Sequence, residues 1–239
     1  MGRYGSHAGH NPKGKVASGA VGLIDESTEN RNVNKEVIST LKSLKHTVYD
    51  CTCNDAVSVS DCVNKQVKRS NAQKLDLTCS IHFNSGAKDE KGNGKTTGVE
   101  VLICTDKAKK EAEQICKNLA SLGFKNRGVK KTTRLGFLNK TVAPALLVEV
   151  CFVDDKDDVN LYKKIGAKKV GEAIAYGILC KNIPTTPKPP ANNSSSNTTN
   201  TSKELYRVVT NSYSVKENAE KEIEKLKKQG INAFIHIDK

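Results

Sequence analysis

The chain has 239 residues, carries a formal net charge of +13, and is 36% hydrophobic and 27% charged. This length allows one sizeable domain and a second, small one, and no apolar run approaches the roughly 18 residues of a spanning helix, which argues against a membrane protein. Aromatic residues make up 5% and tryptophan is absent. The basic charge therefore lacks the interleaved aromatics of a nucleic-acid-binding surface. It equally suits a different anionic polymer, and solubilising surface charge is the alternative.

Helical and strand-like patterns alternate over the first 180 residues. Apolar residues recur at helical spacing over 27–45 and over 55–73, where Val57, Val59, Val63 and Val67 are expected on one side of the helix. A helix over 106–121 ends before Gly123, and two more cover 155–164 and 166–179. Strands are predicted within 1–25 and at 47–49, 75–81, 99–103 and 145–150, with loops over 85–97 and over the basic residues that precede 145. This alternation predicts an α/β fold with a central sheet.

The composition changes abruptly after residue 182. Residues 183–203 are first proline-rich and then consist almost entirely of Asn, Ser and Thr, which is typical of a linker. Beyond it, a strand at 205–209, a helix at 215–229 and a strand at 233–237 form one β-α-β unit, which is too small to bury much surface alone. The sequence therefore predicts a domain over 1–182, a linker over 183–203 and a small module over 204–239.

The eight cysteines do not form the pattern of a disulfide framework. Cys79, Cys104 and Cys151 lie in apolar runs, where a thiol behaves as a small hydrophobe. Cys51 and Cys53 are separated by one residue, unlike the pairs of zinc knuckles and redox motifs. The N-terminus also lacks the apolar segment of a secretory signal, so we expect reduced thiols and synthesis in a cytoplasm.

Two of the five histidines stand where a metal site is expected. A hydrolytic zinc site of the His₂Glu type needs three protein ligands and an open position for water. His10 lies in a glycine-rich loop that can present a side chain at a sheet edge, and His82 directly follows the strand 75–81. Strand ends are where open α/β sheets place their sites. Each histidine taken alone is also compatible with a surface or hydrogen-bonded role.

Glu149 is an anomaly in the most apolar strand of the chain. It follows Ala145-Leu146-Leu147-Val148 and precedes Val150, and burying an ionised carboxylate without a partner is costly. The partner is either a metal site, in which case Glu149 is catalytic, or a buried lysine or arginine, in which case it is structural.

The motifs occur in an order that resembles a known family. They are Gly9-His10, Glu26 ahead of a helix, Ser80-Ile81-His82-Phe83-Asn84-Ser85, Asn126-Arg127-Gly128-Val129 and Leu147-Val148-Glu149-Val150-Cys151-Phe152. Over about residues 3–180 this series resembles the zinc N-acetylmuramoyl-L-alanine amidases of the type-3 family. The resemblance implies that His10, Glu26 and His82 bind Zn²⁺ and that Glu149 assists catalysis. It also implies a twisted, mostly parallel or mixed sheet flanked by helices.

The acidic ligand is the least certain member of this set, since Asp25, Glu26 and Glu29 lie close together. Glu26 is preferred because it stands 20 residues before His46, an interval that the resemblance implies. It is also followed by Val33, Val37 and Leu41 on one helical face. Glu29 remains the alternative, and His7 is a minor rival for His10.

The C-terminal residues resemble half of a SPOR (sporulation-related) repeat through Tyr206-Arg207-Val208-Val209, Gly230 and Ala233-Phe234. SPOR modules bind glycan strands stripped of stem peptides and normally contain two such halves. The single half implies a wall-binding module that pairs with a second copy as a homodimer, or one that is truncated. A small packing appendage is the alternative.

The function implied is zinc-dependent hydrolysis of the amide between N-acetylmuramic acid and L-alanine in bacterial peptidoglycan. The basic surface would then contact anionic wall polymers. Lys and Arg residues within 125–134 would contact the carboxylates of the stem peptide. Another zinc peptidoglycan hydrolase, a peptidase or deacetylase, and a non-catalytic wall-binding protein are the rivals. Without a signal peptide, we expect cytoplasmic synthesis and action on the wall after release, either as a phage endolysin or as a sporulation hydrolase.

Overall fold

The computed structural model of the protein describes residues 1–184, 217 and 220–224. By contacts, the chain divides into two compact units, Met1–Pro187 and Lys188–Lys239. The predicted strands at 205–209 and 233–237 and most of the predicted linker lie outside the described residues. Residues 217 and 220–224, which fall within the predicted helix 215–229, are helical.

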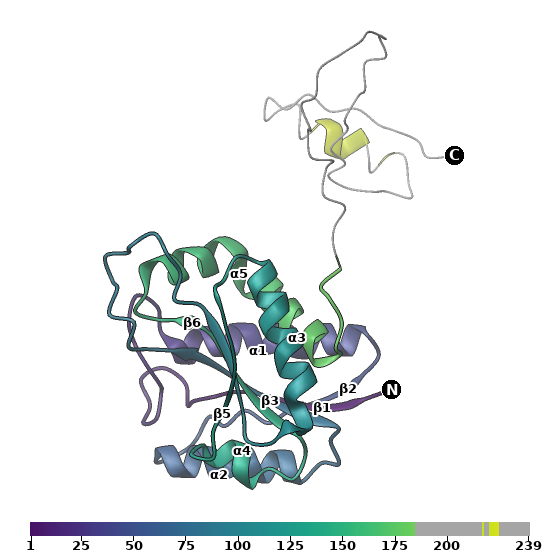
Figure 1. Ribbon diagram of the computed structural model, residues 1–239. Coiled ribbons are helices and arrows are strands. Elements are labelled where there is room, and N and C mark those ends of the chain that lie inside the picture. The colour runs from purple at the N-terminus through teal and green to yellow at the C-terminus, as the bar shows by residue number, and fades with distance from the viewer. Residues whose placement is uncertain (185–216, 218–219, 225–239) are drawn as a thin grey trace, which may run out of the picture. The chain divides into compact units, whose positions relative to one another are not determined.

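A single mixed sheet of six strands forms the centre of the first unit, in the order β2-β1-β3-β6-β4-β5 (Figure 1). Its β4 runs antiparallel to β6, and every other pair of neighbours is parallel. This confirms the expected α/β fold with a mostly parallel, mixed sheet. The strands are β1 (Arg3–Ala8), β2 (Thr47–Asp50), β3 (Leu77–Asn84), β4 (Val99–Ile103), β5 (Asn126–Lys131) and β6 (Ala145–Phe152).

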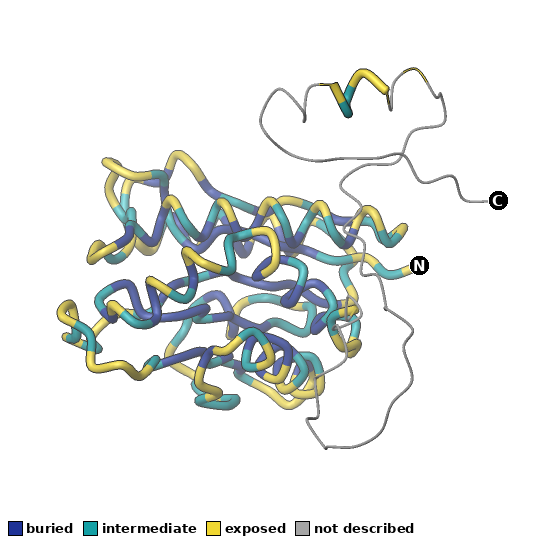
Figure 2. The backbone as a smooth tube through the Cα atoms, turned by 90° about the horizontal axis from the view of Figure 1, so that it is seen from above, coloured by how far each residue is buried: buried dark blue, intermediate teal, exposed yellow. Residues whose placement is uncertain are grey.

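Helices cover both faces of this sheet (Figure 1). One face carries α1 (Glu26–Ser43), α3 (Lys109–Ser121) and α5 (Lys156–Ile178), and a 3-10 turn, η1 (Asp106–Ala108), leads into α3. The other face carries α2 (Val59–Asn71) and the short α4 (Gly136–Lys140). The buried residues lie along the strands and the inner sides of the helices, and the exposed ones along the outer turns (Figure 2).

The helical spacing read from the sequence explains why α1 packs on the sheet. Its residues Val33, Val37 and Leu41 are each 0% exposed. The predicted break between the helices 155–164 and 166–179 is also real, because Gly166 interrupts α5 with φ +82° and ψ +153°. Glycine adopts that conformation readily, whereas other residues are strained there.

Three local predictions were wrong. Val57 and Val59 are 80% and 63% exposed, because Ser58 caps α2 and the helix begins only at Val59. The basic segment predicted as a loop contains β5 and α4. As an edge strand, β5 has one neighbour and tolerates exposed lysines, so its sequence lacks the apolar alternation by which strands are recognised. Finally, β3 continues to Asn84, so His82 lies within the strand near its end.

The strand directions bring the functional segments to one edge of the sheet. The C-terminal ends of β1, β3 and β6 meet there, because these strands are parallel. Since β4 and β5 run the opposite way, they present their N-terminal ends at the same edge. Residues from five separate segments of the sequence can therefore share one site.

Candidate metal centre

His10 stands on a loop that is held from several sides. The backbone N–H of Gly9 donates to the carbonyl of Ile81 at 2.9 Å, which extends the pairing of β1 with β3 by one residue. Asn11 is 0% exposed, and its side chain donates to the carbonyls of Val16 and Ala56. Arg31 donates to the carbonyl of His10 at 2.6 Å. These contacts hold the loop backbone on both sides of His10 in place.

Glu26 is the first residue of α1 and is 3% exposed. Asp25 is the N-cap, whose side chain accepts the N–H of Thr28 at 3.1 Å. The Glu26 carboxylate points away from the helix and accepts the N–H of Ala20 on Oε2 and that of Phe83 on Oε1. Both oxygens are thereby oriented by backbone groups, so the carboxylate has little freedom to turn.

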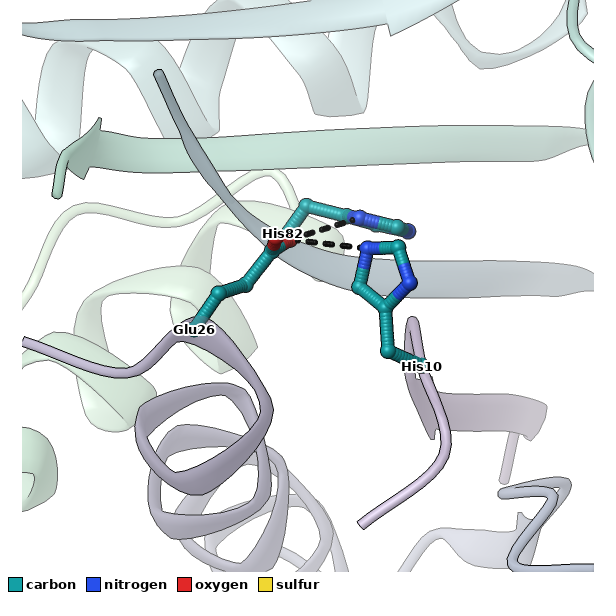
Figure 3. Close-up of side chains that lie close together, drawn as sticks. All are labelled: His10, Glu26 and His82. Atoms are coloured by element: carbon teal, nitrogen blue, oxygen red, sulfur yellow. Dashed lines mark hydrogen bonds and ion pairs between the residues drawn. The ribbon is translucent and has the colours of Figure 1, made fainter. Parts of the chain in front are cut away.

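His10, Glu26 and His82 converge on one point (Figure 3). Oε1 of Glu26 lies 3.1 Å from Nε2 of His10 and 3.0 Å from Nδ1 of His82, and the three ligand atoms all lie within 4.8 Å of one another. Ligands placed 2.0–2.1 Å from a tetrahedral zinc ion are separated by roughly 3.3 Å. The two distances to Glu26 are thus within a few tenths of an ångström of that separation, and the residue types are those of a His₂Glu zinc site.

The electrostatics at Glu26 and His82 favour the deprotonated forms of these two residues. Burial by itself raises the pKa of Glu26, but the hydrogen bonds and charges of His10 and His82 outweigh it and lower that pKa below its ordinary value. Burial also lowers the pKa of His82. A carboxylate and neutral imidazoles are the forms in which these residues bind a metal.

Gly9 explains why a glycine precedes His10. A Cβ atom on Gly9 would lie 2.1 Å from both Cε1 and Nε2 of His82. The imidazole rests directly on the Gly9 backbone and turns its Nδ1 to Glu26. The motif Gly9-His10 thus positions two side chains of the group, one of them from another strand.

The two rival ligands lie elsewhere. Glu29 accepts hydrogen bonds from the Tyr162 hydroxyl at 2.7 Å and from Asn32 at 3.1 Å. His7 is 0% exposed and packs edge-on against Phe137, with ring centroids 4.4 Å apart. Its Nδ1 lies 3.3 Å from the carbonyl of Ala8, and burial lowers its pKa to about 3. Neither residue belongs to the converging group.

Glu149 is the neighbour of His82 across the sheet, since the two residues are register partners on β6 and β3. Its Oε2 is buried and has no hydrogen-bond partner among the described residues. Burial raises the pKa of Glu149 well above its ordinary value, and the charges of Glu26 and Glu100 raise it further. No buried lysine or arginine pairs with it in the described part of the chain, so the structural alternative has no partner there.

Glu100 was missed as a site residue in the sequence, although its signal was the same as that of Glu149. It is a lone carboxylate in the apolar strand Val99–Ile103, and its register partner on β6 is Glu149. Oε1 accepts from Asn84 at 3.0 Å and Oε2 from Nε of Arg127 at 2.8 Å. The site thus continues across the sheet beyond Glu149.

Comparison with known proteins decides the family. The model of the N-acetylmuramoyl-L-alanine amidases matches residues 7–180, which include all the converging side chains. The chain belongs to that family. A second model, the SPOR domain, matches residues 187–236.

Similar proteins agree with this assignment. An uncharacterised protein of Clostridium perfringens is 38% identical over 182 residues, which are 76% of this chain and 52% of that protein. The endolysin of Bacillus phage SPP1 is 30% identical, over 72% of this chain and 62% of its own length. The chain thus spans about half to two thirds of the length of these curated relatives.

Solved amidase domains have the same fold. The catalytic domain of an endolysin targeting Clostridia difficile superposes with a TM-score of 0.69 at 29% identity, covering 77% of this chain and 100% of that domain. The catalytic domain of CwlV, an amidase from Bacillus (Paenibacillus) polymyxa, gives 0.61 at 26% identity, covering 74% and 96%. Among the described residues of this chain, no helix combines the length and apolar character needed to cross a membrane.

Proposed function

We propose that the protein hydrolyses the amide bond between N-acetylmuramic acid and L-alanine in bacterial peptidoglycan, with Zn²⁺ held by His10, Glu26 and His82. The observation that carries the proposal is the convergence of these side chains beside Glu149, a half-buried residue whose buried Oε2 has no partner among the described residues. A zinc ion bound there would supply a Lewis acid that polarises the scissile carbonyl and lowers the pKa of water.

Glu149 acts as the general base and then as the general acid in this scheme. It is aligned with His82 across adjacent strands, so its carboxylate stands next to the metal group and not within it. It accepts the proton of the attacking water and passes that proton to the amine of the departing L-alanine. Burial raises the pKa of the Glu149 carboxyl, which suits it to deliver a proton, and a zinc ion bound beside it would favour the ionised form that first accepts one. Glu26, His10 and His82 are unsuited to that role, because each would be occupied as a ligand of the ion.

The remaining parts of the proposal concern the wall. The SPOR match over 187–236 supports a C-terminal wall-binding module, although it also covers most of the predicted linker. We keep as a proposal the division into an amidase domain over 1–182, a linker over 183–203 and a module over 204–239. We propose that this module binds peptidoglycan glycan and that a homodimer through it completes the two-half unit. The lysine-rich surface would add contacts to anionic wall polymers. Action on the wall as a phage endolysin is favoured by the endolysin relatives, with a sporulation hydrolase as the second role.

Mass spectrometry of digested wall tests the reaction. New free amino groups on L-alanine support the amidase, whereas new reducing ends indicate a glycosidase, new glucosamine amines a deacetylase, and new amino groups further along the stem a peptidase. A protein without activity but with wall affinity would be a binding protein only.

Glu149→Gln tests the catalytic role, and Glu29→Gln is a matched control on the neighbouring carboxylate that lies outside the group. Glu149→Gln should retain zinc and lose activity by about 10²- to 10⁴-fold, as expected for a general acid–base residue. Glu29→Gln should remain within a few-fold of the wild type. A Glu149→Gln protein with full zinc content and near-normal activity would refute the assignment.

A further inference from the structure

A row of side chains leads away from the metal group across three neighbouring strands and onto the edge strand. His82 on β3 is the register partner of Glu149 on β6, and Glu149 is the register partner of Glu100 on β4. Arg127 on β5 then bonds the Glu100 carboxylate. Register partners in a sheet point to the same face, so these residues line one surface that starts at the metal group.

Arg127 is held in a fixed orientation at the end of this row. Its Nε donates to Oε2 of Glu100 at 2.8 Å, and its guanidinium carbon lies 5.0 Å from the centroid of the Phe152 ring. Glu100 is itself fixed by Asn84. Both oxygens of Glu100 are therefore engaged, which makes Glu100 a positioning residue for the arginine.

The terminal nitrogens of Arg127 are available to a ligand. A guanidinium has five N–H donors, and the bond to Glu100 uses the one on Nε. Nη1 and Nη2 make no hydrogen bond to any residue in the described part of the chain, and the side chain is 33% exposed. A planar, immobilised pair of N–H groups is suited to bind a carboxylate with two parallel hydrogen bonds.

The nearest free carboxylate of the proposed substrate matches the position of Arg127. The lactyl carboxyl of muramic acid is consumed in the scissile amide, and the second stem residue, a γ-linked D-glutamate, keeps its α-carboxylate. With 3.8 Å between consecutive Cα atoms, this group lies roughly 7 Å from the scissile nitrogen, and a charge-assisted hydrogen bond extends the reach to about 10 Å. Glu100 is two strands from His82, which is also about 10 Å at 4.8 Å per strand, and the Arg127 side chain reaches back to the Glu100 carboxylate from β5, one strand further away.

From this correspondence we propose that Arg127 binds the α-carboxylate of the second stem-peptide residue and makes the enzyme discriminate against walls in which that carboxylate is amidated. The proposal rests on the proposed function, since it assigns a subsite to the same substrate. An α-carboxamide presents an N–H donor to a guanidinium that has only donors, so one hydrogen bond is lost and the other loses its charge assistance.

Two muramoyl tripeptides that differ only at this group test the proposal. One carries the free α-carboxylate and the other the α-carboxamide, and release of the L-alanine amine is measured for each. The wild type should cleave the carboxylate substrate at least about 10-fold more efficiently. Arg127→Gln should lose about 10- to 100-fold in kcat/KM on that substrate, mostly through KM, and change less than about 3-fold on the carboxamide.

Lys117→Gln is the control, because it removes the same charge from an exposed position on α3, away from the row of side chains. It should leave the ratio between the two substrates unchanged. The carboxamide rate also serves as an internal measure of correct folding. Equal losses of Arg127→Gln on both substrates, no preference in the wild type, or an equal shift in Lys117→Gln would each overturn the proposal. If the wild type released no L-alanine amine from either tripeptide or from wall, the proposed function itself would fall, and this subsite with it.

Discussion

The close approach of Gly9 to His82 predicts that one methyl group should weaken metal binding without unfolding the protein. In Gly9→Ala, the new Cβ would stand 2.1 Å from Cε1 and Nε2 of His82, whereas real Cβ contacts are essentially never under 3.0 Å. The His82 ring must therefore move away by about 0.9 Å, which is more than four times the roughly 0.2 Å tolerance of a zinc–nitrogen bond length.

The substitution should leave the stability of the fold almost unchanged. The atoms in conflict belong to a side chain that can rotate, and Gly9 does not have the positive φ that would strain an alanine. Gly→Ala substitutions at such positions change stability by less than about 1 kcal/mol through the unfolded chain. We expect zinc affinity to fall about 10- to 100-fold, or 1.4–2.8 kcal/mol, with activity falling at limiting zinc.

Competition with a chromophoric chelator measures the zinc affinity, and urea unfolding in excess chelator measures the stability of the metal-free fold. Gly136→Ala is the control, because a Cβ on that glycine meets nothing closer than Cγ1 of Val63 at 3.3 Å and lies at the start of α4, outside the site. It should bind zinc like the wild type. A Gly9→Ala protein that also binds zinc like the wild type, with its fold intact, would refute the reasoning.

Three further predictions follow from the same structure. Removing zinc with a chelator should abolish hydrolysis and lower the free energy of unfolding by about 2.7 kcal/mol relative to zinc at 100 times its Kd, and added Zn²⁺ should restore both. Burial lowers the pKa of His7 from 6.5 to about 3, so the unfolded chain takes up a proton below pH 6.5 that the folded chain does not. The free energy of unfolding should therefore fall by on the order of 1 kcal/mol per pH unit as the pH drops from 6.5 towards 3. In urea melts of the chelated protein, His7→Leu should make this pH dependence weaker. A thiol reagent should modify Cys180 rapidly and Cys104 slowly in the native protein, whereas the six buried cysteines should react only after unfolding; fast reaction of all eight would contradict the buried positions.

Local sequence carries much of the fold. The spacing of Val33, Val37 and Leu41 indicates the buried face of α1, and the isolated Glu149 indicates a polar function in an apolar strand. Both signals depend on periods of 3.6 and 2 residues, which the backbone imposes wherever a helix or strand packs on a core. β5 has no such signal, because an edge strand with exposed lysines need not bury alternate residues. Its place is decided by its pairing with β4 in the folded sheet.

The candidate site was likewise only partly predictable from the sequence. The sequence by itself made His10, His82 and Glu149 candidates: Glu149 because it is anomalous in an apolar strand, and the histidines because their flanking motifs resemble those of the family. It did not decide between Glu26 and Glu29 as the acidic metal ligand, since both are acidic residues in the first turn of one helix. Only the tertiary structure separates them: α1 meets the sheet so that Glu26 faces the two histidines while Glu29 bonds Tyr162 of α5. The partnership of Glu149, Glu100 and Arg127 likewise exists only in the sheet, because strand register, which local sequence does not encode, aligns residues that lie far apart along the chain.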